Sequence, residues 1–200
     1  MYKSTFAGMV ATFAAIVALI ACPIESNAEN LNPDQAQQSI SNRFTEIYER
    51  YEPGDIITGD DADFIKAHAE IANAPSTRAQ DKVKAFQRTE SKYGTEVRFN
   101  GKMWHQGTFE YNYGGNLQAT LKSGPTPKKM TMSVNCQAYG LVADGYVVTY
   151  EGSVTHTANG VKSTSMNKSK NYTGVVALYY VNATLDVTTA GGQGFNIVVT

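Results

Sequence analysis

The sequence predicts an α+β fold, in which an N-terminal segment of two or three helices precedes an antiparallel β-sandwich or β-barrel of about eight strands. Apolar residues recur at helical spacing as far as residue 94, and at every second position from residue 95 onward. The longest alternating stretch is 173–189, with Val181 and Leu185 on one side and Asn182 and Asp186 on the other. Such a stretch predicts a strand at the centre of a sheet, with one face on a core and the other meeting water over half its length.

The first 28 residues have the organisation of a secretory signal peptide. Lys3 supplies a short basic region, residues 6–21 are apolar, Pro23 breaks the apolar run, and small residues lead up to Ala28. We therefore expect export with cleavage after Ala28. The predicted organisation is a signal peptide over 1–28, a helical segment over 29–94 and an antiparallel β domain over 95–200.

A second cleavage point competes with the first. The tetrapeptide Leu19-Ile20-Ala21-Cys22 resembles a bacterial lipobox, whose cysteine is lipidated and becomes the first mature residue. A lipid on Cys22 would tether the protein to a membrane. Because Pro23 and the residues before Glu29 fit ordinary cleavage, we favour a periplasmic or secreted protein. Lipid anchoring at the cell envelope through Cys22 is the alternative.

The first predicted helix starts at Asn32, an N-cap residue followed by Pro33 at the first helical position. Apolar residues from Ala36 to Tyr51 then recur on one helix face, and Glu52-Pro53-Gly54 ends the helix. We expect this amphipathic helix to pack against the β domain.

The loop after this helix is acidic, with Asp55, Asp60, Asp61 and Asp63. A calcium site is one interpretation, but the loop lacks the ligand spacing and the glycine of an EF-hand. We favour the interpretation that Asp60 or Asp61 caps a helix over 61–74. A third helix is predicted over 77–93, from a capping box at Thr77 and a stop at Gly94.

Glycine-containing turn signals divide the alternating half of the chain. Gly114-Gly115 predicts one hairpin, and Asn159-Gly160 predicts a second hairpin between 153–158 and 161–165. This second hairpin is rich in serine, threonine, asparagine and lysine, which is typical of a sheet edge. Pore-forming toxins insert hairpins of similar composition into membranes, so a toxin is a minor alternative.

The chain has two cysteines, Cys22 and Cys136. After either cleavage Cys136 has no intramolecular partner, so we expect no disulfide and a fold that relies on its core. Cys136 follows Met132 and Val134 at a period of two residues, which predicts a buried structural thiol.

The sequence contains no catalytic, cofactor or metal-binding signature. The net charge of −1 does not indicate nucleic-acid binding, which usually needs a basic face. The three histidines, His68, His105 and His156, lack metal-ligand spacing. The leading expectation is an exported, non-enzymatic binding or envelope-interaction protein without a cofactor, whose partner is an unknown protein or envelope component.

Two further functions stay open. Trp104, His105, Tyr111 and Tyr113 could line a barrel cavity that carries a small apolar ligand. A secreted hydrolase would need a histidine, such as His105 or His156, close to an acid and a hydroxyl. An apolar cavity open to solvent would favour the carrier, whereas a filled core with an exposed aromatic patch would favour the interaction protein.

Overall fold

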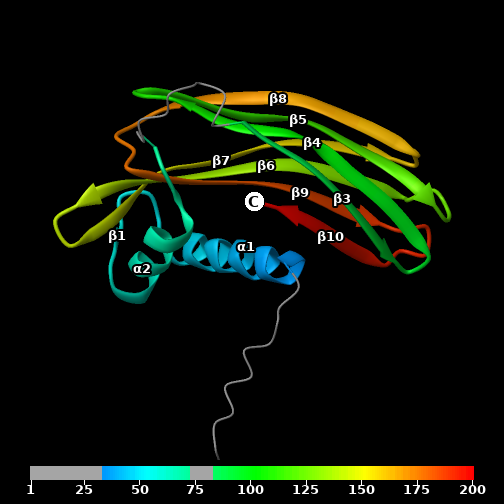
Figure 1. The fold of residues 1–200 in the computed structure, drawn as a ribbon, viewed down its shortest axis with the longest axis horizontal. Helices are drawn as coiled ribbons and strands as arrows, with labels where there is room; N and C mark the ends of the chain where they lie inside the picture. The colour runs from blue at the N-terminus through cyan, green and yellow to red at the C-terminus, as the bar shows by residue number, and fades with distance from the viewer. Residues whose placement is uncertain (1–32, 73–82) are drawn as a thin grey trace, which may run out of the picture. The chain divides into compact units, whose positions relative to one another are not determined.

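The computed structural model describes residues 33–72 and 83–200 (Figure 1). The predicted signal peptide, Cys22, the Asn32 cap and the capping box at Thr77 lie outside these residues.

The predicted α+β class is confirmed, as two helices and ten strands in the described residues. The elements are α1 Pro33–Arg50, β1 Ile56–Ile57, α2 Gly59–His68, β2 Glu70–Ile71, β3 Val83–Lys92, β4 Thr95–Gly107, β5 Glu110–Ser123, β6 Lys129–Val142, β7 Gly145–Asn159, β8 Ser163–Thr173, β9 Leu178–Thr188 and β10 Gly194–Val199. The strands form two antiparallel sheets. The six-stranded sheet has the order β1-β7-β6-β9-β10 with β2 also paired to β9, and the four-stranded sheet has the order β3-β4-β5-β8.

The main core lies between the inner faces of the two sheets. Alternate residues of β6 and β9, such as Val134 and Leu185, pack there with Phe99 of β4 and Leu117 of β5, and all four are fully buried. β9 hydrogen-bonds to β6 on one side and to β10 on the other, so the central strand predicted over 173–189 is confirmed over Leu178–Thr188. Thr173 is instead the last residue of β8, and residues 174–177 connect the two strands. The core is filled with methionine, valine, leucine and tyrosine side chains.

A second core lies on the outer face of the six-stranded sheet, which α1 and α2 cover (Figure 1). Phe44 and Ile47 of α1 and Ile65 of α2 pack there against Leu178 and Tyr180 of β9. The helices cover only part of this face, which explains why β9 is apolar on this side at its start and polar farther on. The first predicted helix and its packing on the β domain are confirmed. Neither α1 nor α2 is long and apolar enough to cross a membrane.

The predicted capping role of Asp60 or Asp61 is wrong. Thr58 is the N-cap residue of α2, and it makes no side-chain capping hydrogen bond. Asp61 is instead 5% exposed and accepts hydrogen bonds from Arg43 and Arg50 of α1, each at 2.5 Å. No group of three or more candidate metal ligands occurs in the described part of the chain.

The second helix is shorter than predicted. α2 ends at His68, and Glu70 and Ile71 form β2 on the edge of β9. The Glu70 carboxylate accepts a hydrogen bond from Tyr179 at 2.7 Å and pairs with Lys84. These tertiary contacts replace the helical turn that local propensity favours.

The third helix is a wrong prediction over its described part, because Val83–Lys92 is strand β3. β3 pairs with β4 from Val83 opposite Trp104 to Lys92 opposite Thr95. Tyr93 and Gly94 join the strands with φ of 53° and 71°. Two successive residues at positive φ form the tight turn of a two-residue hairpin, so the Gly94 signal is a hairpin turn and not a helix end.

The predicted Gly114-Gly115 hairpin is also wrong, because both glycines lie inside β5. They are needed for close packing. A Cβ on Gly114 would meet the Lys168 carbonyl oxygen of β8 at 2.3 Å, and one on Gly115 would meet Val134 of β6 at 2.8 Å.

A turn does follow Asn159, and Gly160 has a φ of 63° there. The two strands it joins do not form the predicted hairpin, however, because β7 pairs with β6 while β8 pairs with β5. The turn therefore carries the chain from the six-stranded sheet to the four-stranded sheet.

Candidate functional site

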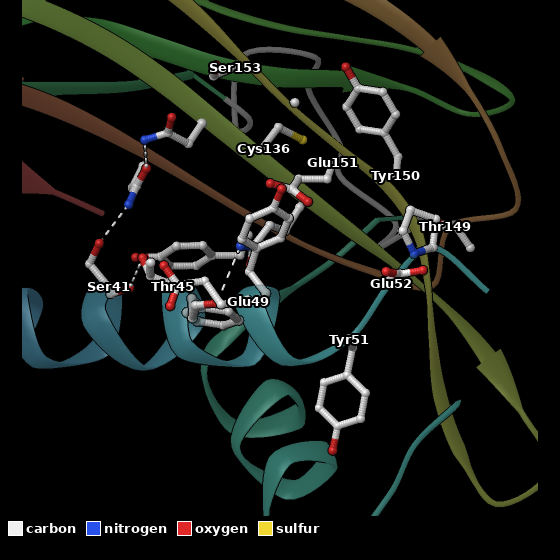
Figure 2. A pocket seen from close by; sticks show the side chains of 18 residues that line it. Ser41, Thr45, Glu49, Tyr51, Glu52, Cys136, Thr149, Tyr150, Glu151 and Ser153 are labelled. Carbon is white, nitrogen blue, oxygen red and sulfur yellow. Dashed lines mark hydrogen bonds between the residues drawn. The ribbon is translucent and has the colours of Figure 1, made fainter. Parts of the chain in front are cut away.

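A groove of about 870 Å³ lies between α1 and the outer face of the six-stranded sheet (Figure 2). One wall is the flank of α1 that carries Thr45, Tyr48 and Glu49, and the loop after α1 extends this wall. The other wall comes from β6, β7 and β9. The groove exists because α1 covers the β9 side of this face and leaves the β7 side open.

A chain of polar contacts fixes α1 on the sheet beside the groove. Asn135 of β6 donates to the Asn182 side-chain oxygen at 2.9 Å, and Asn182 of β9 donates to the Ser41 hydroxyl at 2.8 Å. The Phe44 ring stacks on Tyr180 with centroids 3.7 Å apart. Buried hydrogen bonds together with ring packing hold the two walls at a set separation.

The groove is acidic. Among the residues that the structure describes, its lining includes Glu49, Glu52 and Glu151 and no lysine, arginine or histidine. The two arginines of α1, Arg43 and Arg50, lie on the other flank of the helix and pair with Asp61 of α2. Acid and base are therefore separated across α1, with the carboxylates that pair with no described residue on the groove side.

Glu151 stands on the sheet wall of the groove. It lies opposite Gln137 in the β6–β7 ladder and therefore shares the outer face with it. Figure 2 shows its side chain between β7 and α1. No described residue forms a hydrogen bond or ion pair with this carboxylate. Burial raises the pKa of Glu151 to about 7, because the charged form loses solvation.

Aromatic side chains contribute unequally to the groove. Tyr48 of α1 is 40% exposed. Tyr180 of β9 is buried, and its hydroxyl lies beside Ser41 and Asn182 without a hydrogen bond of ordinary geometry to any described residue. Tyr51 points away toward α2, where its hydroxyl donates to Asp61 at 3.1 Å (Figure 2).

Three of the four residues predicted to bind a ligand lie together in the main core. His105, Tyr111 and Tyr113 are at most 1% exposed. The His105 ring stacks on Tyr179 with centroids 3.8 Å apart, and its Nε2 lies 2.7 Å from the Tyr172 hydroxyl. Burial is the main cause that raises the pKa of both tyrosines.

The fourth, Trp104, lies on the opposite face of the four-stranded sheet from His105. Its indole Nε1 donates to the Asn112 side chain at 2.7 Å. A space of about 10 Å³ adjoins Trp104 and His105, which is about the least that holds one water molecule. None of the four predicted residues lines the groove.

Sequence reasoning missed Glu151 and the groove flank of α1. Alternation in the sequence predicts one strand over 146–150 and another over 153–158, and Glu151 falls in the gap between them, whereas β7 runs through this gap without interruption. An acid at an alternating strand position next to Tyr150 and Gly152 was the available signal.

The chain was compared with known proteins. No protein-family model matches the chain, and no curated protein matches it in sequence.

Proposed function

We propose that this is an exported, non-enzymatic binding protein that holds a small ligand in the groove between α1 and the six-stranded sheet. The groove of about 870 Å³ carries this proposal. Small-molecule sites usually measure roughly 300–1,000 Å³, with a few polar groups among apolar and aromatic walls. The filled core between the sheets leaves the groove as the better place for a ligand than a barrel cavity.

The chemistry of the lining favours binding over catalysis. Hydrolysis through a nucleophile needs a hydroxyl or thiol beside a base, most often a histidine. Ser41 and Thr45 line the groove, but no histidine does, and Ser41 is already hydrogen-bonded to Asn182. The groove therefore offers hydrogen bonds, charge and ring faces to a ligand.

The predicted signal peptide supports a location in the periplasm or outside the cell, with an anchor at Cys22 as the alternative. The intact mass of the protein from its own cells separates the two. Cleavage after Ala28 gives a chain that begins at Glu29, whereas anchoring gives a chain that begins at a lipidated Cys22. In either location, an envelope component or another exported protein is the proposed partner that receives or supplies the ligand.

The test of groove binding is thermal unfolding in the presence of a library of small metabolites. Thr45→Trp fills the groove, and Ser39→Trp places the same side chain on an exposed position of α1 outside the lining. We expect some compounds to raise the Tm of the wild type and of Ser39→Trp by about 3 °C or more, but not that of Thr45→Trp. Compounds that stabilise all three proteins equally, or a library without any stabilising compound, would contradict the proposal.

A further inference from the structure

The charges of the groove are not balanced within the described residues. Glu49, Glu52 and Glu151 line it, while the nearby cations Arg43 and Arg50 are engaged with Asp61 on the far flank of α1. A partly buried carboxylate without a partner loses hydration and gains nothing in return. A cation bound in the groove would compensate for the lost hydration.

The unpaired groups lie beside an aromatic wall. Tyr48 of α1 is 40% exposed and lies on the same groove flank as Glu49, whereas Phe44 and Tyr180 are 1% and 7% exposed and stack on each other. Tyr48 is therefore the main ring that this wall offers to a ligand. Ring faces attract alkylammonium groups, and they also cover the methylene groups of such a ligand. The Tyr180 hydroxyl is a further buried polar group beside Ser41 and Asn182 that makes no hydrogen bond of ordinary geometry to any described residue.

We infer that the ligand of the groove is a small organic amine, whose ammonium group pairs with Glu151 while its carbon chain lies along the aromatic wall. This inference rests on the proposed binding function and names its ligand class. An anionic ligand would meet three carboxylates and no cation. A neutral ligand would leave Glu151 without a partner.

Metal binding is the competing use of a carboxylate cluster. No group of three or more acidic, histidine or cysteine side chains is close enough to hold a metal ion within residues 33–72 and 83–200. The carboxylates are spread along the groove and are flanked by aromatic rings, which suits a chain-like organic cation better than a compact metal ion.

The pairing should depend on pH, because burial raises the pKa of Glu151 to about 7. The titratable groups around it are Tyr48, Glu49 and Glu52 on the helix side and Tyr113, Cys136, Tyr139, Tyr150 and Tyr180 on the strands. Burial raises the pKa of Tyr113, Cys136, Tyr139 and Tyr180, so these four groups stay uncharged near neutral pH. The charge of Glu151 is therefore expected to change between about pH 5.5 and pH 8.5.

The test is isothermal titration of the protein, as its cell processes it, with hexamethylenediamine and with uncharged hexanediol of the same chain length. Glu151→Gln removes the proposed counter-ion without changing its shape. Glu96→Gln is the matched control, because the Glu96 carboxylate accepts a hydrogen bond from Ser123 on the four-stranded sheet, away from the groove.

We expect the diamine to bind the wild type and Glu96→Gln equally, and Glu151→Gln at least about tenfold more weakly. Wild-type affinity should fall about tenfold from pH 8.5 to pH 5.5, while alkylamines, which titrate near 10, keep their charge. Glu151→Gln should not show this fall. Hexanediol should bind no protein measurably.

Three results would overturn the inference. Hexanediol could bind as tightly as the diamine, Glu96→Gln could weaken binding as much as Glu151→Gln, or calcium could bind in the groove and displace the diamine. The diamine could fail to bind while other compounds stabilise the wild type and not Thr45→Trp. The inferred ligand class would then be wrong, and the groove would remain a binding site. If no compound distinguishes Thr45→Trp, the proposed function fails as well.

Discussion

At the scale of single residues, Glu151 gives the protein a pH-dependent stability. Its pKa is about 7 in the folded chain and 4.5 ordinarily, so the folded state holds this proton more tightly than the unfolded state does. The contribution of this group is complete below about pH 4.5 and is lost as the pH rises through about 7.

The variant Glu151→Gln should not lose stability in this way as the pH rises, because its side chain does not titrate. We expect it to unfold at the same urea concentration as the wild type near pH 4.5. At pH 8.5 it should be more stable, by about 1 kcal/mol at most, because water screens a partly exposed group. Urea unfolding at both pH values checks this prediction, and a difference that does not change with pH would refute it.

Gly114 is a second residue for which the structure predicts a measurable effect of substitution on stability. Its missing side chain lets β8 approach, since a Cβ would meet the Lys168 carbonyl oxygen at 2.3 Å. Gly114→Ala should lower the free energy of unfolding by about 3 kcal/mol, because the contact is with backbone that cannot move alone. Asn116→Ala, at an exposed position of the same strand, should change it by less than about 0.5 kcal/mol. Similar effects for the two variants in urea unfolding would contradict the packing role.

The glycines also show what a sequence leaves ambiguous. Gly94 and Gly114 give the same signal in the sequence, but one lies at positive φ in a hairpin turn and the other lies flat inside a strand. Only the neighbouring strand decides between a turn and a close approach. Even in the Asn159-Gly160 pair, where Gly160 does lie at positive φ, the two flanking strands pair with other strands and do not form the predicted hairpin.

At the scale of elements, the joint between α1 and α2 depends on Asp61. Asp61 is 5% exposed, and its carboxylate accepts hydrogen bonds from Arg43, Arg50 and Tyr51. Asp61→Ala should cost about 1–3 kcal/mol, because it removes a buried carboxylate that accepts three hydrogen bonds between the two helices. Asp63→Ala, at an exposed position of the same helix, is the matched control.

Chemical unfolding measures both variants, and the groove offers a second readout. Because α2 holds α1 from the flank opposite the groove, Asp61→Ala should also weaken the diamine binding proposed above, whereas Asp63→Ala should not. Equal stability losses in the two variants would show that the ion pairs contribute little.

β3 shows the limit of local propensity. Its sequence holds lysine, glutamate, glutamine and arginine, which favour helices, and its apolar residues also fit a helical stripe. β3 pairs with β4 along its own whole length, and Phe86 packs on Phe99 with centroids 4.9 Å apart, so the segment is a strand. This pairing with the following strand cannot be deduced from the composition of the segment alone.

At the scale of the whole molecule, the alternating pattern predicted the class of fold and the central strand, and the helical spacing of apolar residues predicted the helix that packs on the sheet. The groove was not predictable in the same way. Its walls come from residues 41–53, 135–137, 149–153, 180 and 182, which meet only after both sheets and α1 are assembled. Sequence reasoning therefore chose conspicuous aromatic residues near Trp104, and the structure places three of them in the packed core.

The same assembled core determines the behaviour of Cys136. This thiol is fully buried between the sheets, and burial raises its pKa to about 12. A thiol reagent needs an accessible thiolate, so it can reach Cys136 only when the sandwich opens. In a Cys22→Ser chain, where Cys136 is the only thiol, labelling should be at least about a thousandfold slower than in concentrated urea. Its rate should rise as low urea concentrations favour opening. Fast labelling in buffer, unaffected by urea, would mean that the two sheets separate locally near β6 without unfolding of the whole sandwich.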